Sequence, residues 1–222
     1  MTTERLDRLL GECGLIRRGG FRPGPEDGVP GAGASLIMIG NDGPGMWRAF
    51  SAERENETNP LDGWSRRHLT RIAEALGAEA FFPFGGPPHL PFQKWAMKAE
   101  RLHPSPIRSL LHRRFGLWHS YRGALLFATP VERPDEEDWP SPCADCAERA
   151  CLDRCPVAAW KPGKLDLAAC IARLGDPAGA DCMGAGCLAR RACPVGRDHI
   201  YEPAQAAFHM NAFLARVRDR SA

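Results

Sequence analysis

The sequence contains no apolar run long enough to cross a membrane. A spanning helix needs about 20 predominantly apolar residues, and no stretch here reaches about 18. The first residues, MTTERLDRLLGECGLI, carry acidic side chains early and lack the apolar segment of a signal peptide. Charge of one sign is also scarce, because the formal net charge is only +2. We therefore expect a cytoplasmic protein that binds neither nucleic acid nor membranes.

Before residue 143 the sequence contains a single cysteine, Cys13. The other eight of the nine cysteines lie between Cys143 and Cys193. In a reducing cytoplasm, clustered cysteines favour metal ligands over disulfides. The polar, proline-rich segment 132–142 marks a boundary between the two regions. We expect a first domain over residues 1–136 and a cysteine-rich domain with a C-terminal helix over residues 137–222.

The glycine spacing near the start is not a dinucleotide-binding fingerprint, because Gly28, Gly31 and Gly33 precede a strand instead of following one. Apolar periodicity predicts helices and strands in alternation. We expect helices over 4–13, 46–54, 60–76 and 203–218, strands over 35–40, 78–84 and 123–128, and an irregular loop over 19–34. Strands that alternate with helices indicate an α/β layer architecture for the first domain.

The cysteines form two groups that each end in Cys-Pro-Val. The first reads Cys143-x2-Cys146-x4-Cys151-x3-Cys155-Pro156, the second reads Cys182-x4-Cys187-x5-Cys193-Pro194, and Cys170 lies between them. Ferredoxins that bind two 4Fe–4S clusters use C-x2-C-x2-C-x3-C-P runs, in which the last cysteine ligates the other cluster. The spacings here are looser than in that run, but they still favour two 4Fe–4S clusters in a small α+β ferredoxin-like module. Two zinc sites of four thiolates each are the alternative.

The module resembles the dicluster ferredoxin domain of epoxyqueuosine reductases and reductive dehalogenases. In those enzymes a lone cysteine between the two groups completes the second cluster, and KLDLAACIARL supplies one here. The resemblance implies that one cluster is held by Cys143, Cys146, Cys151 and Cys193. It implies that the other is held by Cys155, Cys170, Cys182 and Cys187, which leaves Cys13 as an inert thiol.

The preceding part of the chain resembles the same superfamily, and the cobalamin-processing CblC proteins in particular. The match is carried by HRRFGLWHSYRGALLF, residues 112–127, and by the helix–strand unit RRHLTRIAEALGAEAFFPF. The resemblance implies an α/β fold related to flavin nitroreductases that buries a corrinoid, so cobalamin is the expected second cofactor and FMN the alternative. Epoxyqueuosine reductases carry a Gly-Trp-Ile-Gly-Lys segment, a catalytic aspartate and C-terminal helical repeats that are missing here. These departures favour another member of the superfamily.

Two segments are candidates for the corrinoid site. The first is the Gly- and Pro-rich stretch FGGPPHLPF, which follows a predicted strand end, where α/β proteins often bind ligands. The second is the CblC-like motif, whose histidine is either close to the cofactor or a surface or capping residue, and whose aromatic residues line the macrocycle or belong to the core. The candidate residues are Gly85, Gly86, Pro87, Phe92, His112, Phe115, Gly116, Trp118 and Tyr121.

These observations predict an iron–sulfur oxidoreductase that passes electrons from its clusters to a bound corrinoid. The outcome would be cobalamin processing or the reduction of a small substrate. An electron donor of the flavodoxin or ferredoxin reductase type is the expected partner. Two alternatives stay open, a ferredoxin-type electron carrier without corrinoid and a flavin-dependent reductase.

Overall fold

The computed structural model describes residues 3–132, 139–161 and 164–219, and the chain divides into two compact units. The first unit comprises Met1–Leu102 and His119–Asp138, and the second comprises His103–Trp118 and Trp139–Ala222. The boundary expected at residues 136–137 falls outside the described residues. Residues 103–118 belong to the cysteine-rich unit although they precede that boundary, so the second unit is assembled from two separate stretches of chain.

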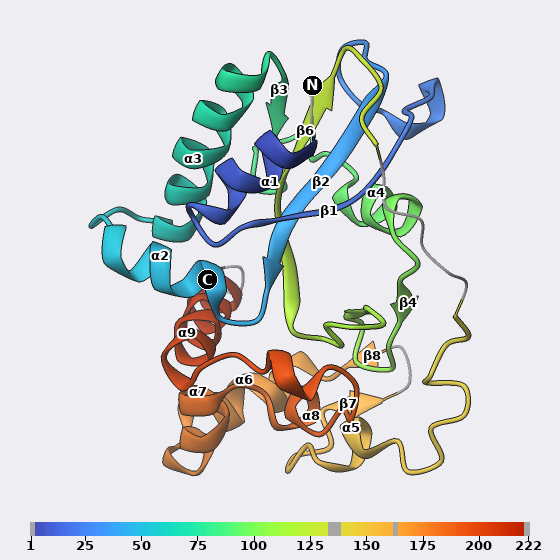
Figure 1. The fold of residues 1–222 in the computed structure, drawn as a ribbon. Coiled ribbons are helices and arrows are strands. Elements are labelled where there is room, and N and C mark those ends of the chain that lie inside the picture. Colours follow the sequence, from blue (N-terminus) through green and yellow to red (C-terminus); the bar gives the residue numbers. More distant parts are fainter. Residues whose placement is uncertain (1–2, 133–138, 162–163, 220–222) are drawn as a thin grey trace. The chain divides into compact units, whose positions relative to one another are not determined.

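The first unit is built on a four-stranded sheet with the order β1-β2-β6-β3, and every pair in it is antiparallel (Figure 1). Its elements are α1 (Thr3–Gly11), β1 (Ile16–Phe21), the 3-10 turn Pro25–Asp27, β2 (Ser35–Asp42), α2 (Gly45–Glu53), α3 (Pro60–Leu76), β3 (Glu79–Phe81), α4 (Phe92–Ala99) and β6 (His119–Phe127). This mixture of helices and strands agrees with the expected α/β class.

Strand β2 is one of the two inner strands of this sheet, and seven of its eight residues, from Ser35 to Asn41, are buried. A central strand covered on both faces reads as a continuous apolar run, which explains the SLIMIG segment. Helices α1, α2 and α3 pack against one another and the sheet, and α4 packs on β1 and β2. Helix α3 has the expected bounds, starts at Pro60, and is followed by Gly77 in the left-handed conformation.

Three of the predicted boundaries are wrong, and one of them is the start of β6, which begins at His119 and not at residue 123. Residues 19–21, expected in a loop, belong to β1, because Gly19 and Gly20 let the backbone approach its neighbours closely. A Cβ at position 19 would lie 2.0 Å from the carbonyl oxygen of Ala99. The strand expected over residues 78–84 is only three residues long, Glu79–Phe81.

The second unit has little sheet, and its helices and turns surround the cysteines. Its elements are β4 (His103–Pro104), β5 (Leu110–Leu111), α5 (Ala150–Asp153), β7 (Trp160–Lys161), β8 (Lys164–Leu165), α6 (Leu167–Gly175), the 3-10 turn Pro177–Gly179, α7 (Ala180–Ala185), α8 (Leu188–Arg191), the 3-10 turn Arg197–His199 and α9 (Pro203–Asp219). The final helix appears where the sequence predicts it. Within the described ranges, no helix is long and apolar enough to span a lipid bilayer.

Candidate functional site

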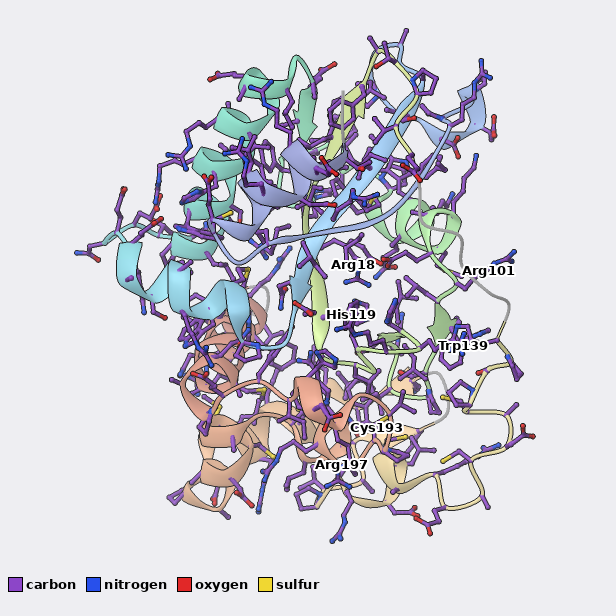
Figure 2. All side chains as sticks on the ribbon, viewed as in Figure 1. Arg18, Arg101, His119, Trp139, Cys193 and Arg197 are labelled. Carbon is purple, nitrogen blue, oxygen red and sulfur yellow. The ribbon has the colours of Figure 1, made fainter. Side chains whose placement is uncertain are left out.

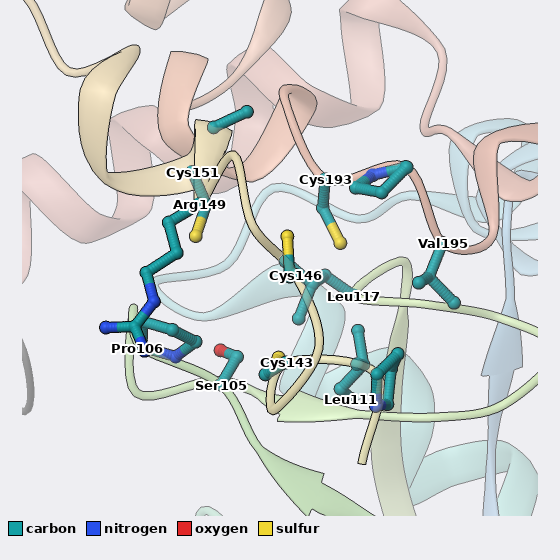
Figure 3. Close-up of a pocket in the computed structure, with 13 residues that line it drawn as sticks. Ser105, Pro106, Leu111, Leu117, Cys143, Cys146, Arg149, Cys151, Cys193 and Val195 are labelled. Atoms are coloured by element: carbon teal, nitrogen blue, oxygen red, sulfur yellow. The ribbon is translucent and has the colours of Figure 1, made fainter. Parts of the chain in front are cut away.

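Four cysteine side chains of the second unit line one cavity. Figure 3 shows the thiols of Cys143, Cys146, Cys151 and Cys193 around a common space of about 170 Å³. The remaining wall is mostly apolar, and Leu111 and Leu117 of the 103–118 stretch contribute to it. The two stretches of chain that make up this unit therefore meet at the thiols.

Burial and the neighbouring thiols disfavour ionisation of Cys143 and Cys151. Burial raises the pKa of Cys143, and the nearby Cys193 and Cys146 raise it further. The pKa of Cys151 is raised first by burial and then by Cys193, Cys143 and Cys146. A compensating positive charge, such as that of a metal centre, would stabilise thiolates at these positions.

Close backbone contacts hold the Cys193 loop in place. Gly116 has a φ of 57°, and a Cβ there would lie 2.0 Å from the carbonyl oxygen of Val195. Gly196 has a φ of 71°, and a Cβ there would lie 2.3 Å from the carbonyl carbon of Phe115. Both positions thus require glycine for conformation and for space. The two glycines fix the segment after Cys193 against the segment that carries Leu117.

The other four cysteines of the unit form a second group. Cys155 follows α5, Cys170 lies on α6, Cys182 on α7, and Cys187 immediately precedes α8. Apolar side chains pack around Cys170 and Cys182, and they come from α6, α7, α8 and α9: Ile171, Leu174, Met183, Leu188, Met210, Phe213, Leu214 and Val217. This second group is embedded in a small core of its own.

Electrostatic coupling links the members of the second group. The pKa of Cys170 is raised to about 11, first by burial and then by Cys187, Cys155 and Cys182. The backbone N–H of Ala159 donates to the Cys155 sulfur at 3.3 Å. Ala158, in the left-handed region at φ 46°, precedes that donor in the chain. A hydrogen bond of this kind is among the features that set the potential of an iron–sulfur cluster.

The two groups have the same membership as the two ligand sets that the family resemblance implies. Within residues 3–132, 139–161 and 164–219, no three His, Cys, Asp or Glu side chains converge closely enough to hold a single metal ion. Cys13 lies apart in the first unit, buried, with its thiol donating to the Leu10 carbonyl at 3.2 Å. Burial raises the pKa of the Cys13 thiol.

The candidate corrinoid residues of the second unit are engaged in packing. The Nδ1 atom of His112 accepts the backbone N–H groups of Arg114 and Phe115, at 3.0 and 3.1 Å. The His112 ring also stacks on Phe115, with 4.2 Å between the ring centroids. Trp118 is 1% exposed and packs edge-on against Tyr201. None of the four candidates in this unit lines the thiol cavity.

The candidates of the first unit lie at separate places within it. A Cβ at Gly86 would meet no atom within 4 Å, so there is open space beside that position. Gly85 is similarly uncrowded, and a cis peptide bond joins Pro87 to Pro88. Phe92 is buried at the start of α4 and packs on Trp95. These four positions flank one loop, whereas Tyr121 lies on β6.

Tyr121 belongs to a buried polar network that the sequence did not reveal. Arg18 and Glu100 are 2% and 5% exposed and form a bidentate ion pair at 2.7 and 2.6 Å. The Tyr121 hydroxyl donates to Glu100, and Arg18 lies 3.3 Å from the Nδ1 atom of His119 (Figure 2). Burial alone would raise the pKa of Glu100, but the charge and hydrogen bonds of Arg18, the Tyr121 hydroxyl and the Gly19 N–H together lower it.

The sequence analysis also missed a second arginine, Arg190, which lies in sequence between Cys187 of one group and Cys193 of the other. Arg190 lies on α8, and its Nε donates to the Leu117 carbonyl at 3.1 Å. Its guanidinium is 4.4 Å from the Trp118 ring centre and 4.7 Å from that of Tyr201. The residue therefore ties α8 to the 103–118 stretch. Its position between Cys187 and Cys193 was the available signal, but its partners Leu117 and Trp118 are distant in sequence.

Comparison with known proteins gives a likeness of fold. No protein-family model and no curated protein matches the chain. A solved epoxyqueuosine reductase bound to an epoxyqueuosine-modified tRNA-Tyr stem loop is 14% identical, with a TM-score of 0.51 over 91% of this chain and 69% of that one. The Bacillus subtilis epoxyqueuosine reductase is 14% identical, with a TM-score of 0.49 over 91% of this chain and 69% of that one. The Streptococcus thermophilus enzyme is 17% identical, with a TM-score of 0.49 over 78% of this chain and 53% of that one. The chain thus spans about half the length of the Streptococcus thermophilus enzyme.

Proposed function

We propose that this protein is an iron–sulfur oxidoreductase that carries two 4Fe–4S clusters on eight cysteines of its second unit. The observation that carries the proposal is the division of those cysteines into two sets of four, one of which surrounds a cavity. The ligands of one cluster are Cys143, Cys146, Cys151 and Cys193. Those of the other are Cys155, Cys170, Cys182 and Cys187.

The size of the cavity fits a cluster better than one zinc ion. Zinc–sulfur bonds are about 2.3 Å long, so four thiolates on one zinc leave no space between them. About 10–15 Å³ suffices to hold one water molecule. The cavity of about 170 Å³ among the first four thiols therefore has room for a group of many atoms. Its thiol donors are the ligands that iron–sulfur clusters take.

The residues of the second unit would hold the clusters and shield them from water. When bound, 4Fe–4S clusters supply one-electron transfer. Leu111 and Leu117 present apolar surface beside the first thiol set, and the core around Leu174 and Leu214 does so beside the second. The backbone N–H of Ala159 stabilises negative charge on the Cys155 sulfur. The same donor would act on that sulfur in the loaded protein.

We further propose that a corrinoid accepts these electrons. The resemblance of residues 112–127 to CblC proteins and the fold shared with an epoxyqueuosine reductase support this step. A flavodoxin or ferredoxin reductase type of protein is the proposed electron donor. The competing proposals are a flavin in place of the corrinoid, and an electron carrier without either.

Reduction of epoxyqueuosine in tRNA is the second candidate function. It is favoured by the structural neighbour with a TM-score of 0.51, which is an epoxyqueuosine reductase with a modified tRNA stem loop. A binding assay with that stem loop separates the two candidates. Specific binding, followed by conversion of the modified base, would favour the tRNA substrate. The corrinoid-processing proposal expects neither.

The deciding experiment is metal analysis and visible spectroscopy of anaerobically purified protein. Two clusters of four irons predict about eight irons and about eight acid-labile sulfides per chain. Stoichiometric zinc without sulfide would overturn the proposal. Titration with hydroxocobalamin and, separately, with FMN then tests the second cofactor. A shift of the corrinoid bands at micromolar protein is expected, and binding of FMN alone would identify a flavin reductase.

A further inference from the structure

One buried donor beside the second thiol group lacks an acceptor. The Nε atom of Arg173 is buried and has no hydrogen-bond partner among the described residues. Arg173 lies on α6 three residues after Cys170, so the two side chains share one face of the helix. Burial raises the pKa of Cys182, and the charge of Arg173 partly opposes that effect. The guanidinium is therefore close enough to act on Cys182.

Three other buried or half-buried arginines have a counter-charge in place, whereas Arg190 donates to a backbone carbonyl. Arg18 pairs with Glu100, and Arg122 pairs with Asp62 at 2.6 Å. Even Arg191 on α8, whose Nη1 is buried without a hydrogen bond, has the Asp181 carboxylate at 3.7 Å. Within the described part of the chain, Arg173 has no such carboxylate.

We propose that Arg173 is a hydrogen-bond donor and fixed positive charge for the cluster of Cys155, Cys170, Cys182 and Cys187, and that it raises the reduction potential of this cluster. The inference rests on the proposed function. An unmade buried hydrogen bond is costly, and a cluster sulfur is an acceptor that the thiols alone do not provide. Positive charge and hydrogen bonds at the sulfurs favour the reduced form, which carries one more negative charge.

The test is a redox titration of the iron-loaded full chain, followed by electron paramagnetic resonance. Arg173→Gln removes the charge, and Arg173→Lys keeps a charge but removes the guanidinium. Arg154→Gln is the matched control, because Arg154 adjoins Cys155 in sequence but is exposed. In Arg173→Gln we expect one of the two reduction steps to become at least tenfold less favourable, a shift of about 59 mV for a one-electron couple. In Arg154→Gln, the potentials of both reduction steps should equal those of wild type.

A second readout does not depend on the stability of Arg173→Gln. In protein labelled with ¹⁵N-arginine, the reduced cluster should show a hyperfine coupling to arginine nitrogen that Arg173→Lys abolishes. Absence of the coupling in wild type, its persistence in Arg173→Lys, or unchanged potentials in an iron-loaded Arg173→Gln protein would each overturn the inference. In those cases the iron content still supports the proposed function. Wild-type protein that takes up no iron and sulfide would overturn both.

Discussion

Replacement of Cys170 by alanine tests the division of the cysteines most directly. Cys170 stands between the two cysteine motifs, and its assignment depends on its neighbours in the second group, Cys155, Cys182 and Cys187. Apart from Cys182, the described side chains that pack around it are apolar, and Met183 and Met210 are the sulfur-containing ones among them. Loss of the Cys170 thiolate therefore leaves three strong ligands where a cubane needs four. We expect this cluster to be lost and the other retained.

The expected magnitude follows from that count. Iron and acid-labile sulfide should each fall from about eight to about four per chain. The broad visible absorption of the clusters should fall to about half. The measurement is iron and sulfide analysis of anaerobically reconstituted protein, with electron paramagnetic resonance of the reduced sample. The wild type should show the interaction of two neighbouring paramagnets, and the variant a single isolated centre.

Cys13→Ala is the matched control for this experiment. Its thiol is also buried and also has a raised pKa, but it lies in the first unit and donates to Leu10. Iron content in this variant should equal that of wild type. Equal iron content in Cys170→Ala and wild type would refute the partition. Complete loss of iron in Cys170→Ala would show that the two groups do not load independently.

Three further outcomes follow from the described contacts. Glu100→Gln should lower the free energy of unfolding of the first unit by about 3–5 kcal/mol, because it leaves Arg18 buried without its counter-charge. Urea titration followed by tryptophan fluorescence measures this loss. A smaller loss in Glu100→Gln than in the double variant Arg18→Met/Glu100→Leu would contradict this reasoning. The pKa of Glu100 is lowered in the folded protein, so its contribution to the free energy of unfolding should be complete above about pH 4.3, the ordinary glutamate value. This contribution should be lost as the pH falls through the folded pKa. If the free energy of unfolding depends on pH in the same way in wild type and Glu100→Gln, the ion pair does not contribute. Gly116→Ala should disturb the Cys193 loop and reduce cluster content, since its Cβ would lie 2.0 Å from a carbonyl oxygen, whereas Gly86→Ala meets open space and should keep wild-type iron.

The features that sequence reasoning predicted are those that depend on local pattern. The run at residues 35–40 identifies β2 because a strand buried on both faces is apolar throughout. Helix α3 follows from the apolar period of residues 60–76. The cysteine spacings led to the eight candidate ligands for the same reason, since ligands of one cluster recur at short intervals.

The features that escaped prediction depend on contacts between distant residues. Strand β1 contains Arg17-Arg18-Gly19-Gly20, which has no alternating apolar pattern, and it forms because β2 and α4 lie beside it. The Arg18–Glu100 pair joins residues 82 positions apart. Neither partner is unusual in its own segment, so their burial could not be read from the sequence. The assignment of residues 103–118 to the cysteine-rich unit has the same origin.

The discontinuity of the second unit means that the cysteine-rich region is not a portable module. A fragment cut at the proline-rich linker would keep all eight clustered cysteines but lose Leu111, Leu117 and the backbone of Gly116. It would also lose the carbonyl that Arg190 binds. The fragment would thus lack part of the wall of the cavity that Cys143, Cys146, Cys151 and Cys193 line. A deletion or fusion that keeps this unit whole must therefore keep residues 103–118 as well as the region after residue 138.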